Sequence, residues 1–63
     1  MSRRGPAVTE TGRVDSLNHE GEGVVRGGKT AFVGGALPGE TVSFIRRRHH
    51  RQHDEAELVA VLE

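Results

Sequence analysis

Residues 21–40, GEGVVRGGKTAFVGGALPGE, carry the strongest structural signal in this 63-residue chain. The nucleotide-binding P-loop pattern G-x-x-x-x-G-K-[ST] is matched by letter at Gly23, Gly28, Lys29 and Thr30. A P-loop lies between a hydrophobic strand and a helix, whose N-terminal N–H groups bind phosphate. Here Val24 and Val25 fall inside the loop itself, and the glycines and proline after Thr30 cannot sustain a helix. The flanking sequence therefore argues against a nucleotide-binding loop.

A β-hairpin explains the same stretch better. Two short segments with β-branched or aromatic residues, 23–26 and 30–33, flank a Gly27-Gly28 turn. Both glycines can adopt the positive φ that tight hairpin turns demand. Further on, Pro38-Gly39 suits the central pair of a type II turn, because Pro fixes φ and Gly accepts a positive value.

Three more strands are expected on either side of this hairpin. Residues 8–18 alternate weakly until Leu17 breaks the phase, which indicates a strand with a bulge. Residues 40–47 alternate apolar and polar side chains, which is typical of a strand. Residues 56–62 are apolar in both phases, and we interpret them as a strand because a helix this short is marginal. The sequence thus predicts an all-β fold, a small five-stranded antiparallel β-barrel, since closure hides the sheet edges.

The chain is long enough for one small domain. Residues 8–63 are predicted to form the barrel, and residues 1–7, with Arg, Gly, Pro and Ser, to form a flexible N-terminal tail. Folding at this size hides only about 60% of the surface that the unfolded chain exposes, so the core is small. The expected core residues are mostly β-branched: Val8, Val14, Leu17, Val24, Val25, Phe32, Val33, Leu37, Val42, Phe44, Ile45, Leu58, Val59, Val61 and Leu62.

Composition narrows the functional classes. The chain has no Cys, which excludes a disulfide framework, a thiolate metal site and a cysteine nucleophile. The absence of Cys is consistent with a protein of the reducing cytoplasm. No apolar run is long enough for a membrane span, and the N-terminus lacks the apolar region of a signal peptide. The nine Lys and Arg residues balance the nine Asp and Glu residues, so the net charge gives no argument for a nucleic-acid partner. We expect a cytoplasmic monomer with no membrane partner.

The central stretch resembles the signature of the TRAM domain, a small RNA-binding β-barrel related in shape to OB-folds. The family elements G-x-G-V-x-R, G-K-x-x-F-V and G-A-L-P-G-E correspond here to residues 21–26, 28–33 and 35–40. Residues 15–24 and 46–56 look most like the N-terminal TRAM domain of bacterial 23S ribosomal RNA (uracil-5-)-methyltransferases. The resemblance covers roughly residues 8–62.

This resemblance implies a module that helps to bind and position ribosomal RNA for an attached catalytic methyltransferase domain. It implies S-adenosylmethionine and an iron–sulfur (4Fe-4S) cluster for the parent enzyme, whereas no cofactor and no enzymatic activity are expected in this chain. Two alternatives stay open: a free-standing small RNA-binding protein, and a barrel that docks on its own catalytic domain without contacting RNA.

Positive charge is concentrated between the last two expected strands. Four of the nine basic residues lie within residues 46–51, and Asp54, Glu55 and Glu57 follow closely. Guanidinium groups bind phosphate with two parallel hydrogen bonds and stack on exposed bases. A solvated charged turn is the alternative, and period-two geometry prevents all six residues from contacting one RNA strand. The candidate RNA-binding residues are Arg46, Arg47, Arg48, His49, His50 and Arg51, with Lys29 and Arg26 beside the glycine turn.

The aromatic and histidine residues suggest other sites only weakly. Phe32 and Phe44 are expected in the core, because so small a barrel needs both rings there. His49, His50 and His53 are close in sequence, but adjacent residues point apart on a strand and no cysteine supplements them. We therefore expect no metal site and no catalytic site.

Overall fold

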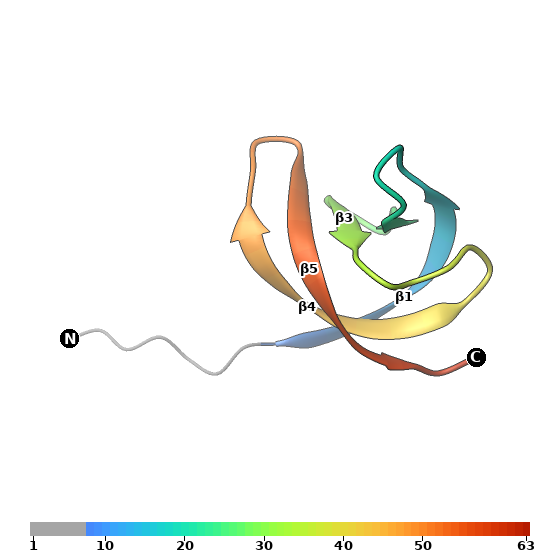
Figure 1. The fold of residues 1–63 in the computed structure, drawn as a ribbon. Helices are drawn as coiled ribbons and strands as arrows, with labels where there is room; N and C mark the ends of the chain where they lie inside the picture. The colour runs from blue at the N-terminus through green and yellow to red at the C-terminus, as the bar shows by residue number, and fades with distance from the viewer. Residues whose placement is uncertain (1–7) are drawn as a thin grey trace.

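The computed structural model describes residues 8–63, so the flexible tail expected at residues 1–7 lies outside the described residues. Within that range the chain forms five strands and no helix. They are β1 (Thr9–Leu17), β2 (Gly23–Val25), β3 (Thr30–Val33), β4 (Thr41–His49) and β5 (His53–Val61). The strands close into one barrel in the order β1-β2-β3-β5-β4, which confirms the expected all-β, five-stranded barrel (Figure 1). No helix that could cross a membrane is present in residues 8–63.

The direction of one strand pair refines the expectation of antiparallel pairing. Four neighbouring pairs, β1–β2, β1–β4, β2–β3 and β4–β5, are antiparallel. β3 and β5 run parallel, with Thr30 opposite His53 and Val33 opposite Ala56. An odd number of strands cannot alternate in direction around a closed ring. At least one parallel pair is therefore unavoidable in this five-stranded barrel.

The last two strands are longer than the sequence predicts. β4 was expected over residues 40–47 but continues to His49, and β5 was expected over residues 56–62 but begins at His53. The segment interpreted as a possible charged turn is therefore mostly strand, and only residues 50–52 connect β4 to β5. This exposed connection lies at the end of a long hairpin that projects beyond β3 (orange in Figure 1).

Two local predictions are confirmed. The register of β1 against β2 shifts between Val14 and Ser16, so the first strand carries the expected irregularity. The backbone N–H of Glu40 donates to the carbonyl oxygen of Leu37 at 3.1 Å, and Gly39 has φ of +88°. Both features fit a type II turn with Pro and Gly at its centre.

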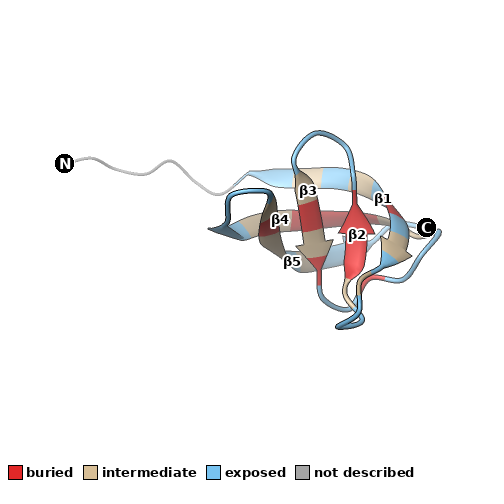
Figure 2. Ribbon diagram, turned by 90° about the horizontal axis from the view of Figure 1, so that it is seen from above, coloured by how far each residue is buried: buried red, intermediate tan, exposed pale blue. Residues whose placement is uncertain are grey.

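The core is smaller than expected. Its buried cluster contains Val14, Val25, Ala31, Val33, Ala36, Val42 and Phe44. Small residues such as Ala31 and Ala36, which were not predicted, fill an interior that admits few large side chains. Several expected core residues are instead exposed, at strand ends or in loops: Val8, Leu17, Leu37, Val59, Val61 and Leu62. Figure 2 shows the buried segments, in red, on β2, β3 and β4.

Candidate nucleic-acid interface

A buried carboxylate, Asp54 on β5, organises one end of the barrel. Its side chain is 3% exposed and contacts Lys29 Nζ at 2.7 Å, Arg46 Nη1 at 2.9 Å and His49 Nδ1 at 2.9 Å. The hydrogen bond from Lys29 is the largest cause that holds the pKa of Asp54 well below its ordinary range, against the opposing effect of burial. Asp54 therefore ties the β2–β3 turn and β4 to β5.

The Arg46 side chain is held by contacts within the barrel. It is 14% exposed, and its guanidinium donates to Glu10 at 2.8 Å and to Asp54 at 2.9 Å. The same group lies 5.7 Å from the centre of the Phe44 ring, within the range of a cation–π contact. The hydrogen bond to Glu10 is the largest cause that raises the pKa of Arg46. The structure thus gives this candidate RNA contact a structural position between β1, β4 and β5.

Three other candidate residues contact carboxylates at the surface. Arg47 contacts Glu57 at 2.7 Å with side chains 55% and 60% exposed, and His50 contacts Glu55 at 3.0 Å. Arg26 contacts Asp15 at 3.1 Å, also at the surface. Exposed pairs contribute only about 0–1 kcal/mol, so a phosphate group can replace the carboxylate partner at little cost.

Arg48 and Arg51 are the candidate cations without a carboxylate partner. Both are exposed, and no salt bridge involves either of them within residues 8–63. They lie at the end of β4 and in the connection to β5. Arg13 on β1 is likewise exposed and forms no salt bridge in the described part of the chain. Arg13 pairs with Thr41 at the start of β4, so it lies at the opposite end of that strand from Arg48 and outside the cationic hairpin end.

Phe32 departs from the expected core position. It is only partly buried, between the inward-facing Ala31 and Val33 of β3, and therefore points to the outer face. Its ring stacks on His53, with centroids 4.5 Å apart, and His53 stacks on His50, also at 4.5 Å. We call these three rings the ring stack. Phe44, by contrast, is 1% exposed and fulfils its expected core role.

Three possible metal ligands lie close together at the β4–β5 connection. One ligand atom each from His50, His53 and Glu55 lies within 4.8 Å of the others. His49 and His50 diverge as expected, toward Asp54 and Glu55, but His53 approaches His50 across the turn. The expectation that the chain holds no metal stays a prediction.

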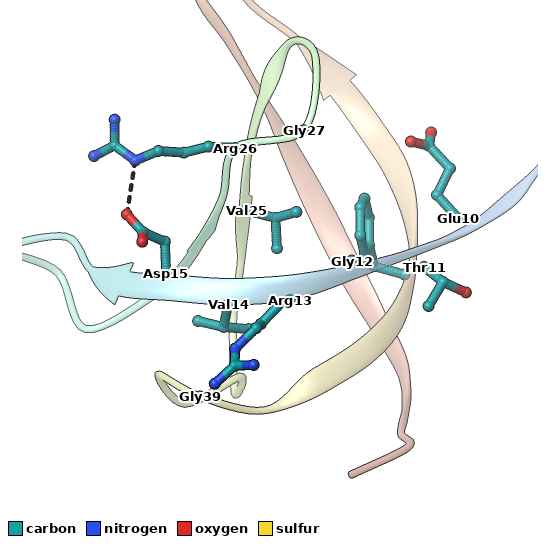
Figure 3. Close-up of a pocket in the computed structure, with 11 residues that line it drawn as sticks. Glu10, Thr11, Gly12, Arg13, Val14, Asp15, Val25, Arg26, Gly27 and Gly39 are labelled. Atoms are coloured by element: carbon teal, nitrogen blue, oxygen red, sulfur yellow. Dashed lines mark ion pairs between the residues drawn. The ribbon is translucent and has the colours of Figure 1, made fainter.

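Two hollows on the surface of residues 8–63 border candidate residues. The larger, about 610 Å³, lies between β1 and the β2–β3 turn (Figure 3). The Arg26–Asp15 ion pair lies beside it, and Val25 and Phe44 are among the residues that line it. Gly12 on β1 borders it, and a Cβ atom there would lie 2.6 Å from Val25, so only glycine fits. The smaller hollow, about 340 Å³, is called the outer groove. The residues that line it are Ser16, Leu17, Asn18, Val24, Arg26, Thr30, Phe32, Gln52 and His53.

Comparison with known proteins provides independent evidence about the family to which this sequence is related. The chain is 41% identical over 57 residues to the 23S rRNA (uracil(1939)-C(5))-methyltransferase RlmD of Legionella pneumophila (strain Corby), which covers 89% of this chain and 13% of that protein. The RlmD of Neisseria lactamica (strain 020-06) is 51% identical over 49 residues, or 76% of this chain and 11% of that protein. The RlmD of Hahella chejuensis (strain KCTC 2396) is 47% identical over 66 residues, or 98% of this chain and 15% of that protein.

These relatives agree with the TRAM resemblance of the central stretch. The chain is homologous over most of its length to a segment of rRNA uracil-C5 methyltransferases, and it spans 11–15% of the length of these three relatives. No protein-family model matches the chain.

Proposed function

We propose that this chain is an RNA-binding TRAM module of a methyltransferase that forms 5-methyluridine in 23S ribosomal RNA. Homology to a short segment of enzymes named for that reaction is the observation that carries the proposal. The module binds ribosomal RNA and helps to position it, and the attached catalytic domain transfers the methyl group. The protein acts as a monomer in the cytoplasm and has no membrane partner.

The cofactors of such an enzyme belong outside this chain. Iron–sulfur clusters are held by cysteine thiolates, and this chain has no cysteine, so its residues do not fit the cluster. S-adenosylmethionine supplies the methyl group in the parent reaction that the TRAM resemblance implies. The barrel described here offers binding and orientation of RNA, and we assign both cofactors to the attached domain.

The exposed end of the β4–β5 hairpin is the proposed phosphate-binding surface. Arg48 and Arg51, which have no carboxylate partner among residues 8–63, are the first contacts. Arg47 and His50 can exchange Glu57 and Glu55 for phosphate oxygens, because those pairs are exposed. Arg46 supports this surface from beneath by fixing β4 against β1 and β5. Lys29 and Arg26 extend the positive surface toward the β2–β3 turn.

A barrel that docks on its catalytic domain without contacting RNA is the second candidate function. Exposed apolar side chains favour it: Leu37 is 55% exposed, Val59 51%, Val61 48% and Leu62 53%. Exposed apolar side chains of this kind are suited to an interdomain contact. The two roles are compatible, so an RNA titration must decide whether the cationic hairpin contributes.

The double variant Arg48→Ala/Arg51→Ala tests the proposal. The unaltered chain, titrated with a 23S rRNA hairpin that has an unpaired loop, should bind with a slope of log K against log salt of roughly −1.5 to −3, as for two to four phosphate contacts. Loss of two contacts should weaken binding and reduce the magnitude of the slope by about 1.4. Arg13→Ala, which removes an equally exposed arginine on β1, is the control. Unchanged affinity and slope in the double variant would favour the docking role instead.

A further inference from the structure

The outer groove lies on the face of β2 and β3 that is turned away from the core. Val24 and Phe32 are directly opposite each other in the β2–β3 pairing, while their neighbours Val25, Ala31 and Val33 point inward. Val24 is only 4% exposed, so the accessible apolar surface of the groove comes mainly from the partly buried Phe32. The groove volume of about 340 Å³ is at the small end of the range for ligand sites, which suits one flat group and excludes a duplex.

One side of the groove is aromatic. Phe32 and His53 both line it, and they belong to the ring stack that continues to His50. His53 lies between Phe32 and His50 in the ring stack, whereas Phe32 is stacked on one side only and is partly buried, so the accessible ring surface in the groove belongs to Phe32. Aromatic surface beside cations is how proteins hold the bases of single-stranded nucleic acid, because every base has a π-face.

The polar rim of the groove can contact the edge and the backbone of such a base. Gln52 forms no side-chain hydrogen bond within residues 8–63, so its amide can both donate and accept. Asn18, by contrast, is already used, because it donates to Glu22 and accepts from two backbone N–H groups in the β1–β2 turn. Arg26 lies at the rim in an exposed pair with Asp15.

The groove is continuous with the proposed phosphate-binding surface. Gln52 and His53, which line the groove, follow Arg51 directly in the chain. A nucleotide whose phosphate contacts Arg51 therefore has its neighbour close to the ring stack. This arrangement matches RNA recognition through unpaired loops, whose bases are splayed out and stacked on side-chain rings.

We propose that the outer groove binds one unpaired base of the RNA, stacked on the accessible ring surface of Phe32, which His53 supports from its other side, with the edge of the base toward Gln52. This inference rests on the proposed RNA-binding function and assigns a base-binding site to it. The arginines of the hairpin supply salt-dependent phosphate contacts, whereas the groove supplies a contact that depends on base stacking and is nearly independent of salt.

Phe32→Leu is the decisive variant, because leucine keeps an apolar side chain but removes the ring. The probe is a single-stranded RNA of six nucleotides with the fluorescent base 2-aminopurine at one position in turn. Stacking should quench the probe at one position when the unaltered chain binds. Phe32→Leu should abolish that quenching and weaken binding at least about fivefold, with the salt slope unchanged. His53→Leu should act in the same direction and replaces Phe32→Leu if that variant does not fold.

The controls separate this inference from the RNA-binding function itself. His19→Ala removes an exposed histidine in the β1–β2 turn and should leave both quenching and affinity unchanged. Arg48→Ala/Arg51→Ala should reduce the salt slope but retain quenching at saturation. RNA binding by the unaltered chain without quenching at any position, and without loss in Phe32→Leu, would overturn the base site and leave the phosphate surface standing. Failure of the unaltered chain to bind either RNA would overturn both.

Discussion

At the scale of single residues, Asp54 shows how a charge can be buried in so small a barrel. Lysine, arginine and histidine side chains surround its carboxylate, and together they hold its pKa well below the ordinary value. A depressed folded pKa means that the ionised form stabilises the fold above the unfolded pKa of about 3.8. This contribution is lost as the pH falls through the lower pKa of the folded state.

Asp54→Asn is therefore expected to lower the free energy of unfolding at about pH 7 and to flatten its decline below about pH 4. Urea unfolding followed by circular dichroism at about pH 7 and about pH 3 measures both effects. Asp15→Asn is the matched control, because Asp15 is an exposed acid paired only with Arg26 in the described residues. Equal destabilisation by the two substitutions at neutral pH would contradict the special role of Asp54.

The sequence could not show which residues of the charged segment 46–51 are held within the barrel and which are exposed. Arg46 and Arg48 look alike in sequence, yet one is nearly enclosed and the other is exposed. The difference arises from Glu10, which is 36 positions away from Arg46 in the chain and reaches it only after β1 pairs with β4. Phe32 was assigned to the core for a similar reason. Its outward position depends on the phase that Ala31 and Val33 impose on β3.

At the scale of secondary structure, the β2–β3 hairpin depends on glycine at one position more than at its neighbour. Gly28 has φ of +91°, a left-handed conformation that residues with a Cβ atom rarely adopt, whereas Gly27 does not have a positive φ. A Cβ atom at either position would find no atom within 4 Å. The two sites therefore differ in backbone conformation and not in available space.

Gly28→Ala should destabilise the barrel by about 1–2 kcal/mol, because alanine is strained at positive φ. Gly27→Ala should be nearly neutral or stabilise by up to about 1 kcal/mol, since alanine restricts the unfolded chain. Urea midpoints of the two variants, measured side by side, give the comparison. Equal midpoints would show that the turn has a different conformation from the one described here.

Strand boundaries were predicted well where neighbouring residues determine them and poorly where residues distant in sequence determine them. β2 and β3 were predicted to within one residue, because the glycine turn is encoded in adjacent positions. β4 and β5 were predicted too short, because their charged residues are held in strands by cross-strand partners, such as Arg47 with Glu57. The odd number of strands alone implies that at least one pair in the closed barrel is parallel, but it does not identify that pair as β3–β5.

At the scale of the whole molecule, the chain corresponds to 11–15% of the relatives compared above. The proposed function assigns RNA binding to this chain and methyl transfer to an attached catalytic domain. A barrel of five strands has a core of only a few valine, alanine and phenylalanine side chains, which leaves little interior for a buried cofactor. Its larger surface hollow lies beside an ion pair and opens to solvent (Figure 3).

The last prediction is that this chain alone transfers no methyl group and binds neither ATP nor S-adenosylmethionine appreciably. The P-loop lysine that the sequence suggested, Lys29, contacts Asp54 and lies in a hairpin turn before a strand, whereas a P-loop lysine begins a helix beside phosphate. A chain without cysteine also has no thiol that could act as a nucleophile. Isothermal calorimetry with each ligand, and a methylation assay with radiolabelled methyl donor and 23S rRNA, are the measurements. A full-length RlmD relative is the positive control. Saturable ATP binding that disappears in Lys29→Ala would contradict the prediction and restore the nucleotide-binding interpretation.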